Sequence, residues 1–295
     1  MNPSRLRSRT LLLLAGLIAG CRTEPIEPGW STPPAQKLVM LSPADLGLEY
    51  ETIEIAAPTG SLYGWFIPAT GAAATVLFNH GSVTNRSTCF AHYVLLHELG
   101  YNVVVYDYRG FGESSDTASL TTLIPDANAV LAYLQDHPEL TAGRIILFGF
   151  SLGTLPTLAQ AARTPTGVIG VILEGSFELD FLPLWSYAPI GVVPSPDVVR
   201  SLYATYPQLD ATQYVGRITL PKLFIHSPED TITPLVGAER LFELAHEPKQ
   251  WCEVYGSHGL SSFDPTYAEC VATFIDSVVR GSNARESQQQ IRSPQ

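Results

Sequence analysis

The sequence predicts an α/β fold in which helices cover both faces of a mostly parallel central sheet. Compact apolar runs at residues 74–78, 101–106 and 144–150 show no polar alternation, as is typical of strands covered on both faces. Stretches with apolar residues at helical spacing separate these runs. The chain has 295 residues, of which 45% are hydrophobic, so it can bury one large core of this kind.

The predicted strands and helices alternate in order along the chain. Residues 52–55 and 61–68 form a predicted hairpin around Pro58-Thr59-Gly60. Further strands are expected at residues 74–78, 101–106, 144–150, 168–173, 222–226 and 250–255. Helices are expected at residues 88–99, 123–134, 152–162, 235–245 and 267–279. This alternation implies an open sheet whose strands are joined through helices on its two faces.

Residues 1–20 are typical of a targeting segment and are left out of the predicted fold. Arg5, Arg7 and Arg9 give a positive start, and a short apolar run ends in small residues. Ile18-Ala19-Gly20-Cys21 resembles the lipobox of bacterial lipoproteins, which implies cleavage before Cys21 and its acylation. Export and a lipid anchor in a bacterial membrane follow from that resemblance, and Arg22 after the cysteine favours the outer membrane. An ordinary secretory signal with an incidental cysteine is the alternative.

The remaining boundaries follow from composition. Residues 21–45 are predicted to be a proline-rich linker that separates the domain from its anchor. The domain is expected at residues 46–280. The polar residues 281–295 lack apolar periodicity and are predicted to be disordered.

Charge and cysteine content exclude two classes of function. The formal net charge is −11 at pH 7, and so acidic a body is repelled by phosphate backbones, so nucleic acid is not an expected partner. Cys89, Cys252 and Cys270 have no metal-ligand spacing, so no zinc site is expected. Two of them could pair in an oxidising compartment, although the spacing does not select the pair, and three buried thiols are the alternative.

The strongest motif is Gly149-Phe150-Ser151-Leu152-Gly153. It follows an apolar strand and precedes a small, apolar helix, which is the setting that a nucleophile elbow requires. Glycines are needed on both sides because a Cβ there would collide with the neighbouring strand or helix. Ser151 is therefore the predicted nucleophile, held at the edge of the sheet above a helix N-terminus.

A serine hydroxyl needs a base, and His258 is the predicted one. It lies in Gly256-Ser257-His258-Gly259, between the last predicted strand and the last helix, where a loop can reach Ser151. The rival histidine is His226, which ends a strand and adjoins the region of the acid.

Asp230 is the predicted acid that orients the histidine. It follows the strand at residues 222–226, and the order serine, aspartate, histidine is the one expected of such a site on an α/β sheet. Glu174, at the end of an earlier strand, is the alternative acid, and Glu229 adjoins Asp230. Asp107 also ends a strand, but that strand precedes the nucleophile.

The predicted site also needs donors for a developing oxyanion. The backbone N–H of Leu152, the residue after the nucleophile, should be one. Asn79-His80-Gly81-Ser82 follows another strand, and Gly81 permits a close approach, so the N–H of Ser82 is the expected second donor.

Together these strings resemble the α/β-hydrolase superfamily, in the branch of Bem46-type and serine-aminopeptidase-like hydrolases. His80-Gly81, the string from Asp107 to Ser114 and the elbow at Ser151 carry the resemblance, together with residues 226–234 and 256–258. Two departures are Ser227 and Ser82, where members of the branch often have glycine and asparagine. The resemblance implies an α/β-hydrolase fold over residues 50–280, and it implies that Arg109 ties loops together.

A proline- and aromatic-rich segment, residues 176–208, interrupts the alternation between two predicted strands. As an insertion above the carboxyl edge of the sheet, it can serve as a small lid that lines an acyl pocket. A long connection that packs its aromatic residues on the core is an equal alternative.

The sequence therefore predicts a serine hydrolase that cleaves acyl esters in a small-molecule substrate, similar to carboxylesterases and lipases, and that needs no metal or cofactor. A peptidase or amidase would use the same residues. A binding protein that retained the fold is the alternative from a different class. The sequence makes no prediction of the oligomeric state.

Overall fold

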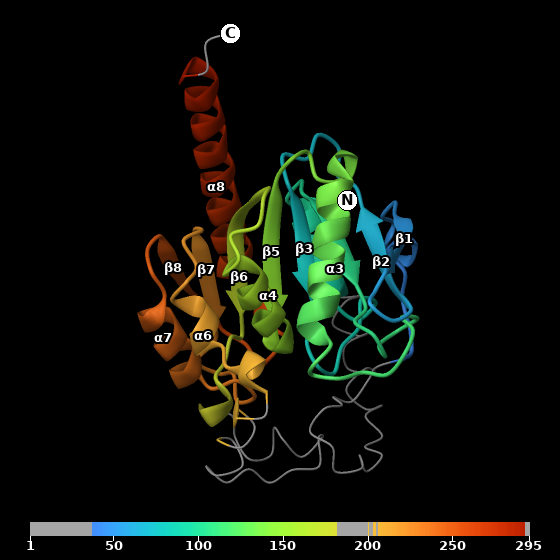
Figure 1. The fold of residues 1–295 in the computed structure, drawn as a ribbon, viewed down its shortest axis with the longest axis vertical. Helices are drawn as coiled ribbons and strands as arrows, with labels where there is room; N and C mark the ends of the chain where they lie inside the picture. The colour runs from blue at the N-terminus through green and yellow to red at the C-terminus, as the bar shows by residue number, and fades with distance from the viewer. Residues whose placement is uncertain (1–36, 182–199, 201–202, 205, 293–295) are drawn as a thin grey trace.

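The computed structural model describes residues 37–181, 200, 203–204 and 206–292, and Figure 1 shows its fold. One eight-stranded sheet forms its centre, in the order β1-β2-β4-β3-β5-β6-β7-β8. The predicted targeting segment with Cys21 lies outside the described residues, as do most of the linker and most of the predicted lid at residues 176–208.

The sheet is mixed at one edge and parallel elsewhere. β1 (Glu51–Ala56) and β2 (Ser61–Ile67) form an antiparallel hairpin, and β2 pairs antiparallel with β4 (Asn102–Tyr106). The other strands are β3 (Thr75–Asn79), β5 (Ile145–Phe150), β6 (Val168–Glu174), β7 (Lys222–His226) and β8 (Lys249–Glu253). From β4 to β8 every pairing is parallel, which confirms the predicted α/β fold and its initial hairpin.

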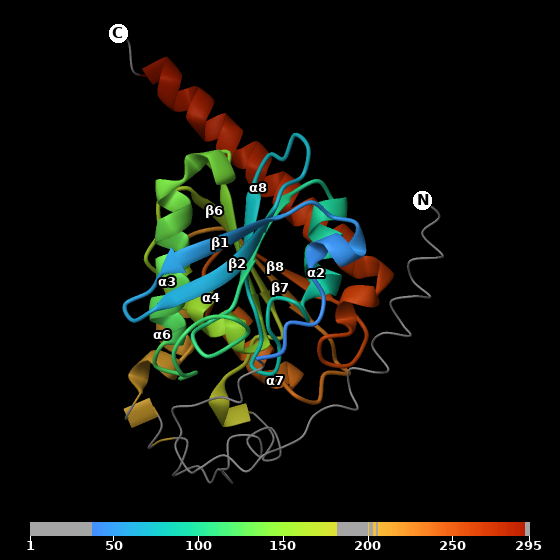
Figure 2. The same ribbon diagram turned by 90° about the vertical axis from the view of Figure 1, so that its right-hand side faces the viewer.

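Helices cover both faces of the sheet (Figures 1 and 2). One face packs against α3 (Leu123–Asp136), α4 (Thr154–Ala161), α6 (Thr212–Val215) and α7 (Leu235–Leu244). The other face packs against α2 (Phe90–Glu98) and α8 (Pro265–Arg292). Consecutive strand residues contribute to opposite faces, as Ile146 and Leu147 do, because side chains alternate along a strand. Among the described residues, no helix is long and apolar enough to cross a membrane.

The chain differs from the prediction at its C-terminal end. Residues 281–295 were expected to be disordered, but α8 continues to Arg292 and projects beyond the sheet in Figure 1. Residues 281–292 include Ala, Arg, Glu and Gln, which favour helix, and the first proline is Pro294. The loss of apolar periodicity at residue 281 therefore does not end the helix.

The start of the domain also differs from the expected residue 46. Residues 37–45, assigned to the linker, lie against the domain: the N–H of Met40 donates to Ser87 Oγ at 3.0 Å, and Asn85 Nδ2 donates to the Leu38 carbonyl at 2.9 Å. Val39 and Leu41 pack on the core. These four apolar residues precede Pro43, the first proline of the described chain, and lead into the 3₁₀ turn Pro43–Leu46.

Candidate active site

Ser151 lies on a strained turn between β5 and α4. Its φ is 52°, in the left-handed region that a side chain rarely adopts. A Cβ on Gly149 would lie 2.5 Å from Thr157 Oγ1 of α4, and one on Gly153 would overlap the Asn79 carbonyl at the end of β3. Both flanking glycines are therefore required, as the sequence predicted, and the turn presents Ser151 at the carboxyl edge of the sheet.

The fold brings the three predicted residues into one hydrogen-bonded chain. His258 Nε2 lies 2.9 Å from Ser151 Oγ, and His258 Nδ1 lies 2.7 Å from Asp230 Oδ2. The three side chains come from the ends of β5 and β7 and from the loop after β8. Because parallel strands end at one edge, residues 107 and 28 positions apart meet there.

Asp230 is fixed on both of its oxygens. Oδ1 accepts the N–H groups of Ile232 and Thr233, each at 2.9 Å, and Thr233 Oγ1 donates to Oδ2 at 2.7 Å. Burial alone would raise the pKa of Asp230, but the hydrogen bond to His258 and these donors outweigh it and hold the pKa below its ordinary value. The carboxylate is therefore ionised at neutral pH and can accept the Nδ1–H of His258.

The rival residues have other partners. His226 Nε2 donates to the Thr233 carbonyl at 2.8 Å, and burial lowers its pKa. Glu174 contacts His92, Ser261 and Tyr267. Glu229 is exposed. The choice between the acids, which the sequence left open, therefore falls on Asp230 by contact with the imidazole.

Of the two predicted oxyanion donors, Leu152 adjoins Ser151 in the chain, and Ser82 belongs to a loop that passes next to it. Leu152 follows it in the 3₁₀ turn Ser151–Gly153. A Cβ on Gly81 would lie 3.3 Å from Ser151 Cβ, so the loop after β3 passes next to the serine. Thr84 Oγ1 donates to the Gly81 carbonyl at 3.0 Å. The Gly81 carbonyl and the Ser82 N–H belong to the same trans peptide and point in opposite directions. The Ser82 N–H therefore points away from Thr84.

His80 is a residue near the site to which the sequence analysis assigned no role, although it belongs to the motif before Gly81. Its Nδ1 donates to the Gly81 carbonyl at 2.8 Å, and its Nε2 accepts the N–H of Tyr108 at 3.5 Å. Complete burial lowers the pKa of His80 to about 4, so the ring is neutral, as these two contacts require. His80 thus fixes the peptide between Gly81 and Ser82. The only sequence signal for this role was its place directly before Gly81.

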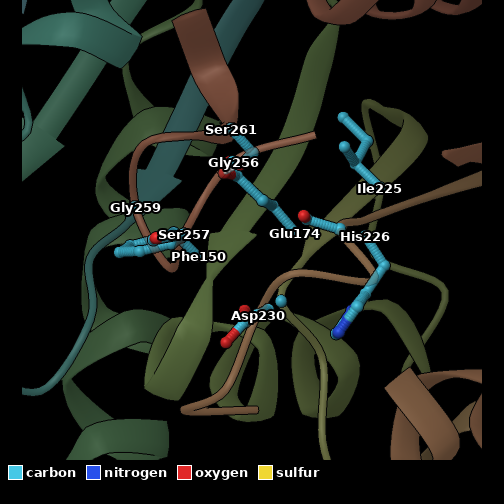
Figure 3. Close-up of a pocket in the computed structure, with 11 residues that line it drawn as sticks. Phe150, Glu174, Ile225, His226, Asp230, Gly256, Ser257, Gly259 and Ser261 are labelled. Atoms are coloured by element: carbon cyan, nitrogen blue, oxygen red, sulfur yellow. Dashed lines mark hydrogen bonds between the residues drawn. The ribbon is translucent and has the colours of Figure 1, made fainter. Parts of the chain in front are cut away.

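A small cavity lies behind the three residues, and Figure 3 shows its lining. Phe150, Glu174, His226 and Asp230 border it, together with the loop that carries His258. Its volume of about 10 Å³ suits one water molecule and is far too small for an acyl group. A substrate must therefore reach Ser151 from outside this cavity.

The described ends of the predicted lid pack next to the elbow. Leu155 of α4 and Leu209 form a small buried cluster, against which Leu179 and Tyr206 pack. The N–H of Leu179 donates to the Tyr203 hydroxyl at 3.2 Å. Both ends of residues 176–208 therefore lie over the helix that follows Ser151.

The cysteines settle an alternative that spacing could not. Cys252 and Cys270 form a disulfide, and Cys89 is free and buried. The disulfide joins β8 to α8 and so closes the segment that carries His258. Within the described ranges, no group of three or more His, Cys, Asp or Glu side chains could hold a metal ion.

Comparison with known proteins identifies a family and relatives of this chain. Residues 76–290 match the model described as "Alpha/beta hydrolase family". The chain is 30% identical over 245 residues to the uncharacterized protein YfhR of Escherichia coli K12, which covers 79% of this chain and 83% of YfhR. It is 32% identical over 199 residues to an uncharacterized protein of Mycobacterium tuberculosis H37Rv, 66% of each chain.

Solved structures show the same fold at lower identity. The Pyrococcus furiosus esterase Pf2001 matches with a TM-score of 0.70 and 19% identity, over 85% of this chain and 99% of the esterase. The Pyrococcus horikoshii acylaminoacyl peptidase matches with a TM-score of 0.56 and 20% identity, over 76% of this chain and 40% of the peptidase. At these identities the likeness shows the fold alone.

Proposed function

The chain belongs to the alpha/beta hydrolase family, and from this premise we propose that it is a serine hydrolase that cleaves acyl esters through Ser151, His258 and Asp230. One observation carries the proposal: a strained elbow serine in a continuous hydrogen-bonded chain with an imidazole and an ionised carboxylate. A domain that only bound a ligand would need none of the three groups in this order.

The mechanism follows from these positions. His258 Nε2 takes the proton of Ser151 as the hydroxyl oxygen attacks the acyl carbon, while Asp230 holds the imidazole in the required tautomer. The N–H groups of Leu152 and Ser82 stabilise the oxyanion, each by about 3 kcal/mol. His258 then protonates the departing alcohol, and a water molecule hydrolyses the acyl-enzyme by the same steps.

We choose esters because two features support them. The structural neighbour with the highest TM-score reported above is named an esterase, and an alcohol leaves more easily than an amine. The apolar cluster of Leu155 and Leu209 beside the elbow suits an apolar acyl group. The reaction as written uses no metal or cofactor.

The first test is covalent labelling of the full-length chain in detergent with a fluorophosphonate probe. The wild-type chain should be labelled at Ser151, and Ser151→Ala and His258→Ala should each abolish labelling and lower ester hydrolysis by about 10⁴-fold or more. Rates on p-nitrophenyl acetate, butyrate and octanoate then define the acyl pocket. Faster cleavage of matched anilides than of esters would make the protein an amidase. A folded wild-type chain that resists the probe would indicate a binding protein.

The proposal also concerns the cellular location of the protein. We infer that the chain is exported and anchored in a bacterial membrane by lipid on Cys21. The disulfide between Cys252 and Cys270 supports export, because disulfides persist in oxidising compartments. Cells fed a labelled fatty acid should label the wild-type chain, and Cys21→Ala should remove both the label and the membrane fractionation. An acylated Cys21→Ala chain would refute the anchor.

A further inference from the structure

Glu174 is a buried carboxylate that joins three separate elements near the proposed site. It ends β6 and is only 2% exposed. Its Oε2 accepts His92 Nε2 of α2 at 2.9 Å and the Tyr267 hydroxyl of α8 at 2.5 Å, and its Oε1 accepts the Ser261 hydroxyl at 2.8 Å. Burial would raise the pKa of Glu174, but His92 and the two hydroxyls hold it below its ordinary value, so the group is a carboxylate.

Two of these three contacts fix the chain directly after His258. The turn that carries His258 is closed by its own backbone bond, from the Leu260 N–H to the Ser257 carbonyl at 2.8 Å. Ser261 follows immediately, so its bond to Glu174 ties the end of this turn to β6. Tyr267 ties the first turn of α8 to the same carboxylate.

Residues next to Glu174 and residues that it binds also pack around the imidazole ring of His258. Phe150 stacks on the His258 ring, with centroids 5.0 Å apart. Phe150 also contacts the His92 ring, with centroids 5.2 Å apart. Gly175, next to Glu174, lies against the imidazole, since a Cβ there would be 3.4 Å from His258 Cε1. Glu174 thus anchors both His92, which backs Phe150, and the turn that bears the imidazole. Figure 3 shows Glu174, Phe150 and Ser261 around the same cavity.

We propose that Glu174 is a positioning residue for His258: through Ser261, Tyr267 and His92 it holds the imidazole at hydrogen-bond distance from Ser151. This inference rests on the proposed function. Its contribution is orientation, and a displacement of about 1 Å at a reacting group can cost up to about 10²-fold in rate. Loss of the carboxylate should therefore lower kcat and the rate of covalent labelling, while KM changes little because no contact to substrate is lost.

The test compares variants of the full-length chain. Glu174→Gln keeps the volume but cannot accept all three donors, and it should lower kcat and the fluorophosphonate labelling rate about 10- to 100-fold, with KM within about twofold. Ser261→Ala and Tyr267→Phe each remove one donor and should lower both rates severalfold. The matched control is Tyr101→Phe, because Tyr101 bonds Asp276 of α8 at 2.9 Å in the same way, away from His258.

The outcomes separate a positioning role from a merely structural one. Thermal unfolding should shift by similar amounts in Tyr267→Phe and Tyr101→Phe, but only Tyr267→Phe should lose kcat. If Glu174→Gln does not fold, Ser261→Ala and Tyr267→Phe still decide. Folded variants at Ser261 and Tyr267 with wild-type kcat and labelling rate would overturn the inference. A wild-type chain that the probe does not label would instead refute the proposed function.

Discussion

Two groups of buried polar side chains lie at the carboxyl edge of the sheet. One is the proposed catalytic cluster of Ser151, Asp230 and His258. The other, which we name the arginine cluster, lies beyond the end of β4 and consists of Arg86, Asp107, Arg109 and Asp126. Both combine charged or polar groups with little exposure: every member is at most 8% exposed except His258, whose side chain is 16% exposed. By burial and charge alone they are equivalent candidates for a site.

In the arginine cluster each aspartate is paired with an arginine. Arg86 bridges Asp107 and Glu113, and Arg109 Nε bonds Asp126 Oδ1 at 2.6 Å. Arg109 also donates from Nη1 to Thr59 Oγ1 at 2.6 Å, which joins the β1–β2 hairpin to the loop after β4. These contacts confirm the prediction that Arg109 ties loops together.

The aspartates of the two clusters respond differently to burial. Burial raises the pKa of Asp107 to about 6 in spite of Arg86, whereas the donors around Asp230 hold its pKa below the ordinary value. The two clusters also differ in whether they hold a group that can react with a substrate. Ser151 keeps a strained φ and an Oγ bonded to a base, whereas each aspartate of the arginine cluster faces a guanidinium. Buried charge by itself indicates only a structural network of ion pairs. A nucleophile on a strained backbone, hydrogen-bonded to a general base, indicates a catalytic site.

The largest expected effect breaks the proposed catalytic cluster without unfolding it. In Asp230→Asn the amide oxygen should occupy the Oδ1 position, which accepts two N–H groups, and so turn its NH₂ toward His258 Nδ1. The imidazole would then carry its proton on Nε2 and could not accept that of Ser151. We expect kcat to fall about 10⁴-fold, measured on p-nitrophenyl butyrate.

The matched control for that variant is Glu229→Gln, which neutralises the exposed neighbouring carboxylate. It should keep kcat within about twofold, as surface changes generally do. Equal losses in both variants would mean that the charge of this loop matters and that contact with the imidazole does not.

The second prediction reverses the pattern in the arginine cluster. Arg109→Met leaves Asp126 buried without its cation, which should lower the free energy of unfolding by about 3–5 kcal/mol. In the folded protein, kcat should stay within about threefold. Urea unfolding measures the first quantity, with the exposed Arg163→Met as a control that should change stability by no more than about 0.5 kcal/mol. A loss of kcat without a loss of stability would make Arg109 part of the site.

The third prediction concerns the covalent link beneath His258. Replacing both Cys252 and Cys270 by alanine opens the link across a sequence separation of 18 and should lower the free energy of unfolding by about 3 kcal/mol. We expect kcat to change less than about threefold, because Glu174 still holds the turn. Wild-type protein in reductant should match the double variant, and a reductant effect that persists in the double variant would point to another cause.

The sequence predicted the parts of the site that depend on local pattern. The elbow at Ser151 and the strand ends before Asp230 and His258 follow from periodicity and glycine placement, so the sheet and its order along the chain could be inferred. Contacts between distant strands could not. Register and packing determine the pairing of Cys252 with Cys270, the partners of Glu174 and the orientation of His80. Composition and spacing carry no information on either. The helix beyond residue 280 was missed because apolar periodicity, the signal used to predict helices, is lost there although helix-favouring residues continue.

His80 lies between the two clusters and gives the smallest predicted effect. Its ring contacts Tyr108 and Phe111 on one side, at 4.4 and 5.1 Å between centroids, and its Nδ1–H holds the Gly81 carbonyl on the other. Burial lowers its pKa to about 4, whereas the unfolded chain has an ordinary histidine near 6.5. Between these values only the unfolded state binds the proton, so stability is complete above pH 6.5 and is lost as the pH falls toward 4.

The loss that this one group causes between pH 7.5 and pH 5 is about 2 kcal/mol. His80→Asn keeps a donor for the Gly81 carbonyl but cannot titrate, so it should lower stability by a constant amount and lack this part of the acid loss. Denaturant unfolding of both proteins at the two pH values measures the difference. Asp107 acts in the opposite sense over the same range, since its raised pKa favours the folded state at low pH, but it is common to both proteins and cancels. Equal acid losses in the two proteins would show that His80 is protonated when folded, and the neutral ring that orients the loop beside Ser151 would have to be abandoned.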